Sequence, residues 1–268
     1  MTTSELVHAP PVALTLGDAI SDAFVIARRH LIRYQRDPQT LVFLFVQPIM
    51  FILLFSYVFG GSIDIPGMDY TSFLVPGIIA QTVTFNNVGT SIAIAEDLQK
   101  GIMDRFRSLP MSGFSVIAGR VLTDLLVTTV TVVFMTAVGY LVGFRITTGF
   151  VPALAGLGLL VIFGFSFSWI AAFIGIKVNS VEVAQSAGFV WLFPLNFISS
   201  VFVVPATMPS ALKAFADVNP ITLTVDALRG LTVGGPVADP LVGALIWAAV
   251  ISVVFGFLVV RAWDGLID

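Results

Sequence analysis

Charge is scarce in this 268-residue sequence: 11% of the residues are charged and 57% are hydrophobic. Soluble domains usually contain about 25% charged residues. This shortage excludes a disordered chain, a nucleic-acid-binding protein and an ordinary cytosolic enzyme. The composition predicts a polytopic helical membrane protein, organised as a single intramembrane domain over residues 1–268.

The residues for several kinds of chemistry are also missing. The sequence has no cysteine, which excludes disulfide bonds, thiolate metal sites and a cysteine nucleophile. His8 and His30 stand outside any H-E-x-x-H motif, so we expect no metal site. No lysine follows a glycine, so the sequence lacks the G-x-x-x-x-G-K-[ST] loop that binds the phosphates of ATP. We therefore expect a chain that is not itself an enzyme.

Six segments of at least twenty residues contain no charged side chain. A helix needs about twenty mostly apolar residues to cross the hydrocarbon core of a bilayer, and backbone groups in lipid must be hydrogen-bonded internally. We therefore predict an all-α polytopic membrane protein with six transmembrane helices. The expected spans are 41–59, 73–95, 122–143, 153–176, 183–204 and 241–260.

The basic residues predict the orientation of these spans. Of the 13 Lys and Arg residues, ten fall before span one, between spans two and three, after span four or after span six. The side of a membrane protein that is rich in Lys and Arg usually faces the cytoplasm. Both termini are therefore expected to be cytoplasmic, and the protein is expected to be a multi-pass protein of the cell inner (plasma) membrane.

An amphipathic helix is predicted over residues 16–36, before the first span. Its apolar side chains fall within an arc of about 100°, and Arg29 and Arg33 lie on the opposite side. Such a helix lies in the membrane interface among the lipids. It serves either as a simple anchor or, in addition, as a contact for a partner protein.

The inner loop contains a second regular stretch, residues 96–110. Apolar residues recur there at helical spacing, and charged residues occupy the other faces. Glu96 and Asp97 would lie in the first turn of this helix, where the helix dipole favours acidic side chains. A charged cytoplasmic helix with an apolar stripe suits docking to another protein, and a solvated interfacial helix is the alternative.

Before the last span, the outer loop 205–240 predicts two short apolar helices separated by Asn219 and Pro220. Each is too short to span the membrane, so the two would re-enter it or lie on its outer leaflet. Asp226 and Arg229 are three residues apart, so they can pair on one helical face. The segment either takes part in transport or forms a packed lid with no direct role in it.

These two loops resemble the ABC-2 family of ABC-transporter permeases, and in particular permease subunits of the daunorubicin/doxorubicin-resistance type. In the inner loop the similar features are an acidic start, a glycine, a Leu-Pro ending, Ser112 and the pair Gly119-Arg120. In the outer loop they are Asn219-Pro220 and the run from Asp226 to Arg229. With the amphipathic entry helix and the six spans, the resemblance covers nearly the whole chain.

The resemblance implies that the chain pairs with a second permease, identical or paralogous, and binds a separate ABC ATPase. The ATPase would hold ATP and Mg²⁺, and the permease would bind no cofactor directly. Helix 96–110 would be the coupling helix, seated in a groove of the ATPase together with residues 16–36. The residues assigned to coupling are Glu96, Asp97, Gly101, Asp104, Arg105, Phe106, Leu109, Pro110, Arg29 and Arg33.

The resemblance also implies that the substrate passes between the two permeases, along spans two and five. The residues assigned to this path are Phe85, Asn86, Asn87, Phe193, Asn196 and Phe197, although ordinary packing is the alternative for each. An apolar wall with a few amides suits the export of hydrophobic or amphipathic drugs, antibiotics or lipids. There are two alternative functions. The chain could be a permease for a cell-envelope polysaccharide or other polymer, or a membrane assembly protein without transport.

Overall fold

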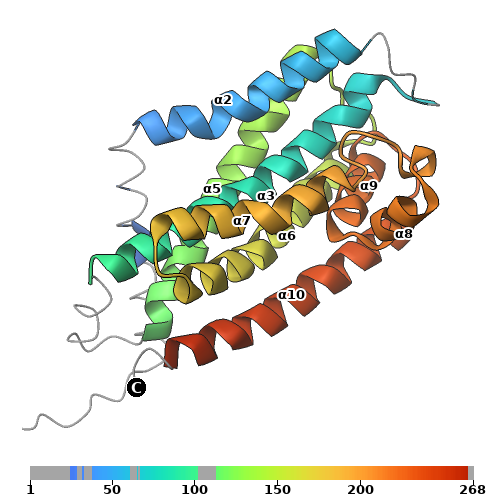
Figure 1. Ribbon diagram of the computed structural model, residues 1–268. Helices are drawn as coiled ribbons and strands as arrows, with labels where there is room; N and C mark the ends of the chain where they lie inside the picture. Colours follow the sequence, from blue (N-terminus) through green and yellow to red (C-terminus); the bar gives the residue numbers. More distant parts are fainter. Residues whose placement is uncertain are drawn as a thin grey trace, which may run out of the picture.

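The computed structural model describes residues 25–28, 32, 38–60, 65, 67–101 and 113–264. All regular elements within these ranges are helices (Figure 1), which confirms the all-helical prediction for the described part of the chain. In chain order they are α2 (Pro38–Leu54), the π-helical turn η1 (Phe55–Phe59), α3 (Tyr70–Gln99), α5 (Gly113–Val142), α6 (Phe150–Lys177), α7 (Val181–Phe197), the 3₁₀ turn η2 (Pro205–Thr207), α8 (Ser210–Val218), α9 (Pro220–Thr232) and α10 (Ala238–Asp264).

Three of the described helices are long and apolar enough to cross a membrane. They comprise Gly119–Val142 within α5, Phe150–Lys177 and Ala238–Trp263 within α10. The first predicted span contains a shorter apolar helix, Phe45–Val58. The fifth is shorter than predicted, because the backbone leaves the helical conformation at Ile198. The predicted split of the outer loop agrees with the boundary between α8 and α9.

Helices α3 and α7 each begin at a side-chain cap. Asp69 Oδ2 accepts hydrogen bonds from the backbone N–H groups of Thr71, at 3.0 Å, and Ser72, at 3.3 Å. Ser180 Oγ accepts one from the N–H of Val183, at 3.2 Å. These bonds satisfy amide groups that have no partner in the first turn of a helix. The polar residues before α3 and α7 therefore set where the two helices start.

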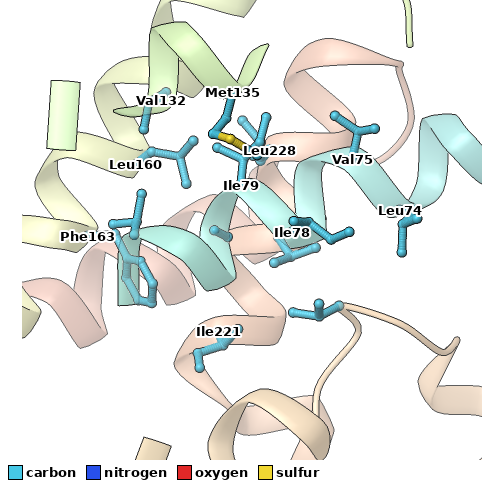
Figure 2. Packing of buried hydrophobic residues seen from close by; sticks show 14 of the residues in the cluster. Leu74, Val75, Ile78, Ile79, Val132, Met135, Leu160, Phe163, Ile221 and Leu228 are labelled. Carbon is cyan, nitrogen blue, oxygen red and sulfur yellow. The ribbon is translucent and has the colours of Figure 1, made fainter. Parts of the chain in front are cut away.

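The centre of the bundle is formed by α3 and α6. In the most apolar stretch of α6, 72% of the residues are buried, compared with 28% in α5 and 22% in α10. The main cluster of buried side chains joins α3 to α5, α6 and α9 (Figure 2). The residues labelled there are Leu74, Val75, Ile78 and Ile79 of α3, Val132 and Met135 of α5, Leu160 and Phe163 of α6, and Ile221 and Leu228 of α9.

The two ends of the bundle differ. One end carries α8 and α9, and the last turn of α3 and the first turns of α5 lie at the opposite end, here called the loop end (Figure 1). A second buried cluster lies at the loop end. It joins Ile26, which precedes α2, to Ile94 of α3, Val121 of α5, Trp169 of α6 and Trp263 of α10. The described part of the N-terminal segment therefore packs against the bundle.

Candidate functional site

The predicted pair of Asp226 and Arg229 is present in α9. Arg229 Nη1 donates a hydrogen bond to Asp226 Oδ1 at 2.9 Å. Ser200 Oγ, from the turn after α7, donates to the same carboxylate oxygen at 2.7 Å. The pairing on one helical face is thus confirmed, and it includes a third residue that the sequence pattern did not indicate.

Arg229 also connects α9 to α3 and to the turn after α7. Its Nε donates to the carbonyl oxygen of Phe73 at 2.8 Å, and its Nη2 donates to the carbonyl oxygen of Ser200 at 2.6 Å. The guanidinium lies 3.6 Å from the centroid of the Phe73 ring. Several partners are what a buried charge needs, because burial removes its water. One side chain, 5% exposed, therefore holds three segments together.

Asn219 links α7 to α9 in a similar way. Its Oδ1 accepts a hydrogen bond from the N–H of Ile221 at 2.9 Å, which caps α9. Its Nδ2 donates to the carbonyl oxygens of Leu195, at 2.7 Å, and Ile198, at 2.8 Å, at the end of α7. Pro220 occupies the first position of α9, where no N–H is required. This double cap explains why the fifth predicted span is shorter than expected.

The phenylalanines assigned to the substrate path lie in one run of aromatic rings. The ring centroid of Phe193 lies 5.7 Å from those of Phe85 and Phe197. The run also includes Phe189, 5.8 Å from Phe85, and Phe202, 5.7 Å from Phe197. Phe193 and Phe197 are 48% and 56% exposed, so the run presents an apolar face to the outside of the chain.

Two members of this phenylalanine run, Phe189 and Phe202, were missed at the level of sequence. Phe189, Phe193 and Phe197 are spaced by four residues, which puts the three rings on one face of α7. That spacing is a signal that could have found Phe189. Phe202 follows the end of α7, so its place depends on how the turn folds back, which no helical periodicity describes.

The three amides assigned to the path have hydrogen-bond partners within the chain. Asn196 is buried, and its Nδ2 lies 3.3 Å from Thr84 Oγ1 on α3. Asn87 Nδ2 donates to a backbone carbonyl of α3 itself, at 2.9 Å. Asn86 Nδ2 donates to Thr131 Oγ1 on α5, at 3.4 Å. The bonds of Asn196 and Asn86 therefore join α3 to α7 and α5, whereas the bond of Asn87 stays within α3.

The predicted coupling helix does not begin where the sequence pattern placed it. Glu96 and Asp97 lie in the last turn of α3, and not in the first turn of a new helix. Lys100 pairs with Glu96, and Gly101 ends the helix with φ +61°, a conformation that glycine adopts without strain. The other residues assigned to coupling lie outside the described residues: Asp104, Arg105, Phe106, Leu109, Pro110, Arg29 and Arg33.

The described residues offer no metal site and a small crevice. No group of three or more His, Asp or Glu side chains lies together there in a way that could hold a metal. A small crevice of about 10 Å³ lies between α3, α5, α6 and α9. Its lining, which includes Ile79, Leu157 and Leu228, is apolar.

Comparison with known proteins shows the family of the chain. Residues 22–233 match the family model described as ABC-2 type transporter. The chain is 34% identical over 216 residues to a daunorubicin resistance ABC transporter permease protein of Streptomyces coeruleorubidus, covering 81% of this chain and 76% of that protein. It is 26% identical over 259 residues to a probable doxorubicin resistance ABC transporter permease protein of Mycobacterium tuberculosis, covering 94% of each. The chain therefore belongs to the ABC-2 type transporter family of ABC-transporter permeases.

Proposed function

We propose that the chain is the membrane-spanning permease subunit of an ABC exporter for hydrophobic or amphipathic drugs, antibiotics or lipids. A separate ATPase subunit would bind ATP and Mg²⁺ and supply the energy. Membership of the ABC-2 family supports this proposal, as do relatives that are named for resistance to daunorubicin and doxorubicin.

The phenylalanine run is the observation that supports the substrate class. Aromatic faces bind flat apolar molecules through stacking and dispersion, without charge. Phe193 and Phe197 offer half-exposed rings, and Phe85 and Phe189 continue the surface onto α3 and along α7. We propose that this face lines the substrate path, and that a second permease, identical or paralogous, closes the path from the other side.

The proposed topology has six crossings, made by α2 with η1, α3, α5, α6, α7 and α10. The 17 residues of α7 rise by about 26 Å at 1.5 Å per residue. A hydrocarbon core is about 30 Å thick, so the turn after α7 would complete that crossing. The distribution of Lys and Arg supports a cytoplasmic loop end that carries both termini. We propose that α8 and α9, each too short to span, re-enter the membrane at the outer end, and that the protein lies in the plasma membrane.

The loop end would receive the ATPase. We propose that residues 96–110 and 16–36 form the contact, as the family resemblance implies. Ile26 and Ala27, within the second segment, are each 2% exposed, and Ile26 belongs to the buried cluster that includes the ends of α3, α5, α6 and α10. A partner that moves this segment would therefore act directly on four helices.

Purification from native membranes tests the proposal. The tagged chain is extracted gently, the proteins that co-elute are identified by mass spectrometry, and ATP hydrolysis is measured. We expect an ATPase with Walker motifs in similar amount, and any second permease in the sample would show whether the pair is identical or paralogous. A chain that is stable alone and elutes without an ATPase would support a membrane assembly protein instead.

A further inference from the structure

A buried ion pair lies where α3 meets α5, near the loop end. Arg120 Nε lies 3.3 Å from Asp124 Oδ1 within α5. Thr90 Oγ1, on α3, donates a hydrogen bond to Asp124 Oδ2 at 2.7 Å. Arg120, Asp124 and Thr90 are 6%, 9% and 1% exposed. In the sequence Asp124 served only as the boundary of a charge-free segment, so neither its burial nor its partner on α3 was expected.

Contacts between α3 and α5 continue away from this pair. Asn86 Nδ2 reaches Thr131 Oγ1 at 3.4 Å. Further along, a Cβ atom on Gly139 would lie 2.7 Å from Cγ1 of Val75, so the two helices approach closely there as well. From one contact to the next, the residue number decreases on α3 while it increases on α5, so the two helices are antiparallel. We call this set of contacts, including those of Asp124, the α3–α5 seam.

The seam connects the two arms of a hairpin whose turn is the proposed ATPase-binding segment. From Thr90 to Gln99, at the end of α3, the chain rises by about 14 Å at 1.5 Å per residue. From Gly113, at the start of α5, to Asp124 it rises by about 17 Å. The two arms therefore reach the buried pair at a similar distance from the segment that joins them.

A buried polar contact restricts how two helices can move against each other. Apolar side chains keep much of their contact when one helix slides along another, whereas a buried carboxylate is stabilised only where its partners meet it. Hydrogen bonds between membrane helices act in this way. Asp124 has one partner on its own helix and one on α3. It therefore favours a single register of the two helices close to the loop end.

We propose that Asp124 is a positioning residue for the coupling of ATP hydrolysis to transport. It holds α3 and α5 in one register, so that the two helices move as one arm when the ATPase displaces the segment between them. Phe85 of α3 belongs to the phenylalanine run, so movement of this arm changes the proposed substrate path. The inference rests on the proposed function and adds the residue that transmits the movement.

Substitutions at Asp124 test this role in the complex with the ATPase, reconstituted in liposomes with doxorubicin as the probe. We expect Asp124→Ala to lower the amount of doxorubicin transported per ATP by about tenfold, within the range that mutations between coupled sites produce. ATP hydrolysis should continue. Asp124→Asn keeps an acceptor for Thr90, so its loss should be smaller. The control is Thr129→Val, which removes a hydroxyl that bonds only within α5 and should change neither quantity.

Distances between spin labels test the arm in a chain that keeps Asp124. The sequence has no cysteine, so Gly89→Cys on α3 and Leu126→Cys on α5 are the only cysteines of the labelled chain. A Cβ atom at Gly89 meets no atom within 4 Å, and Leu126 is 42% exposed. The distance between these labels should stay the same in nucleotide-free and ATP-trapped complexes. The distance from Gly89→Cys to Val253→Cys on α10, which is 71% exposed, should change.

Two results would overturn the proposal. One is an Asp124→Ala complex that transports as much doxorubicin per ATP as the parent. The other is a distance between α3 and α5 that changes with nucleotide while Asp124 is present. Failure of the parent chain to bind an ATPase would contradict the proposed function itself, and with it this inference, so the two failures are distinguishable.

Discussion

The guanidinium of Arg229 lies 3.6 Å from the centroid of the Phe73 ring and donates a hydrogen bond to the carbonyl oxygen of that same residue, at 2.8 Å. The Arg229 side chain of α9 thus contacts both the ring and the backbone of Phe73 on α3. Phe73 lies in the first turns of α3, which continues to Gln99 at the loop end. The contact therefore holds one end of the helix whose other end adjoins the proposed ATPase-binding segment.

Replacement of Arg229 by alanine should destabilise the fold. It removes the donors to Asp226 and to the carbonyl oxygens of Phe73 and Ser200. Breaking a buried ion pair by removing one partner costs about 3–5 kcal/mol. Because the side chain of Asp226 is 39% exposed, we expect the lower part of this range, about 3 kcal/mol. The measurement is the free energy of unfolding of the purified protein in detergent.

The matched control for Arg229→Ala is Lys213→Ala. Lys213 also pairs with an aspartate on its own helix, Asp217, but both side chains are close to half exposed. Exposed pairs contribute about 0–1 kcal/mol, so this variant should remain close to the parent in stability. Equal losses in the two variants would show that the buried contacts of Arg229 do not stabilise the bundle.

Replacement of Gly77 by alanine should also destabilise the protein. A Cβ atom there would lie 2.6 Å from the carbonyl oxygen of Val201, in the turn that Arg229 holds. Inserting an atom into a packed interior costs about 1–3 kcal/mol. Gly89→Ala, in the same helix, is the control, since its Cβ meets no atom within 4 Å. Gly89→Ala should stabilise α3 by up to about 1 kcal/mol. The measurement is thermal unfolding of both variants in detergent. A Gly77→Ala variant as stable as Gly89→Ala would contradict the account.

The proposed orientation can be tested with single cysteines, because the sequence contains none. Ala206 of η2 and Lys177, the last residue of α6, are both exposed. The turn η2 directly precedes α8, which lies at the opposite end of the bundle from the last turn of α6 (Figure 1). A membrane-impermeant maleimide should label Ala206→Cys in intact cells and Lys177→Cys only after permeabilisation. The reverse pattern would place the loop end outside the cell and would remove the proposed access of a cytoplasmic ATPase.

Phe193→Ala should lower drug transport while the stability of the fold changes little. The ring of Phe193 contacts three phenylalanines, yet it is 48% exposed. An aromatic pair contributes about 0.5–1.5 kcal/mol, so losing one contact with a flat drug should weaken its binding by up to about tenfold. Doxorubicin uptake into inverted vesicles is the measurement. The control is Val190→Ala, on the same helix and 73% exposed. Equal uptake in the two variants would argue against a path along these rings.

The features that the sequence predicted correctly depend on local spacing. Helices occur in all six charge-free segments, because long apolar runs can satisfy their backbone groups only within themselves. Asp226 and Arg229 are three residues apart in one helix. Asn219 and Pro220 separate α8 from α9, since an amide cap and a proline both suit the start of a helix.

The features that were missed depend on contacts between distant segments. Thr90 and Asp124 are 34 residues apart, and Arg229 and Phe73 are 156 apart. The spacing of residues within one helix cannot predict contacts between residues of different helices. The start of the coupling helix was wrong because the apolar spacing continues past Gly101, whereas the backbone turns there with a positive φ. The threonine hydroxyls that bond to the side-chain amides of Asn86 and Asn196 likewise depend on how α3 packs against α5 and α7.

The central claim is that this permease converts ATP hydrolysis by a separate subunit into export of an apolar drug. The most direct measurement is doxorubicin accumulation in liposomes that contain the complex of this chain with its co-purified ATPase, oriented with the ATPase outside. The account predicts accumulation that requires ATP and Mg²⁺ and stops when either the permease or the ATPase is left out. ATP hydrolysis by the intact complex with no movement of doxorubicin, of other apolar drugs or of lipids would contradict it.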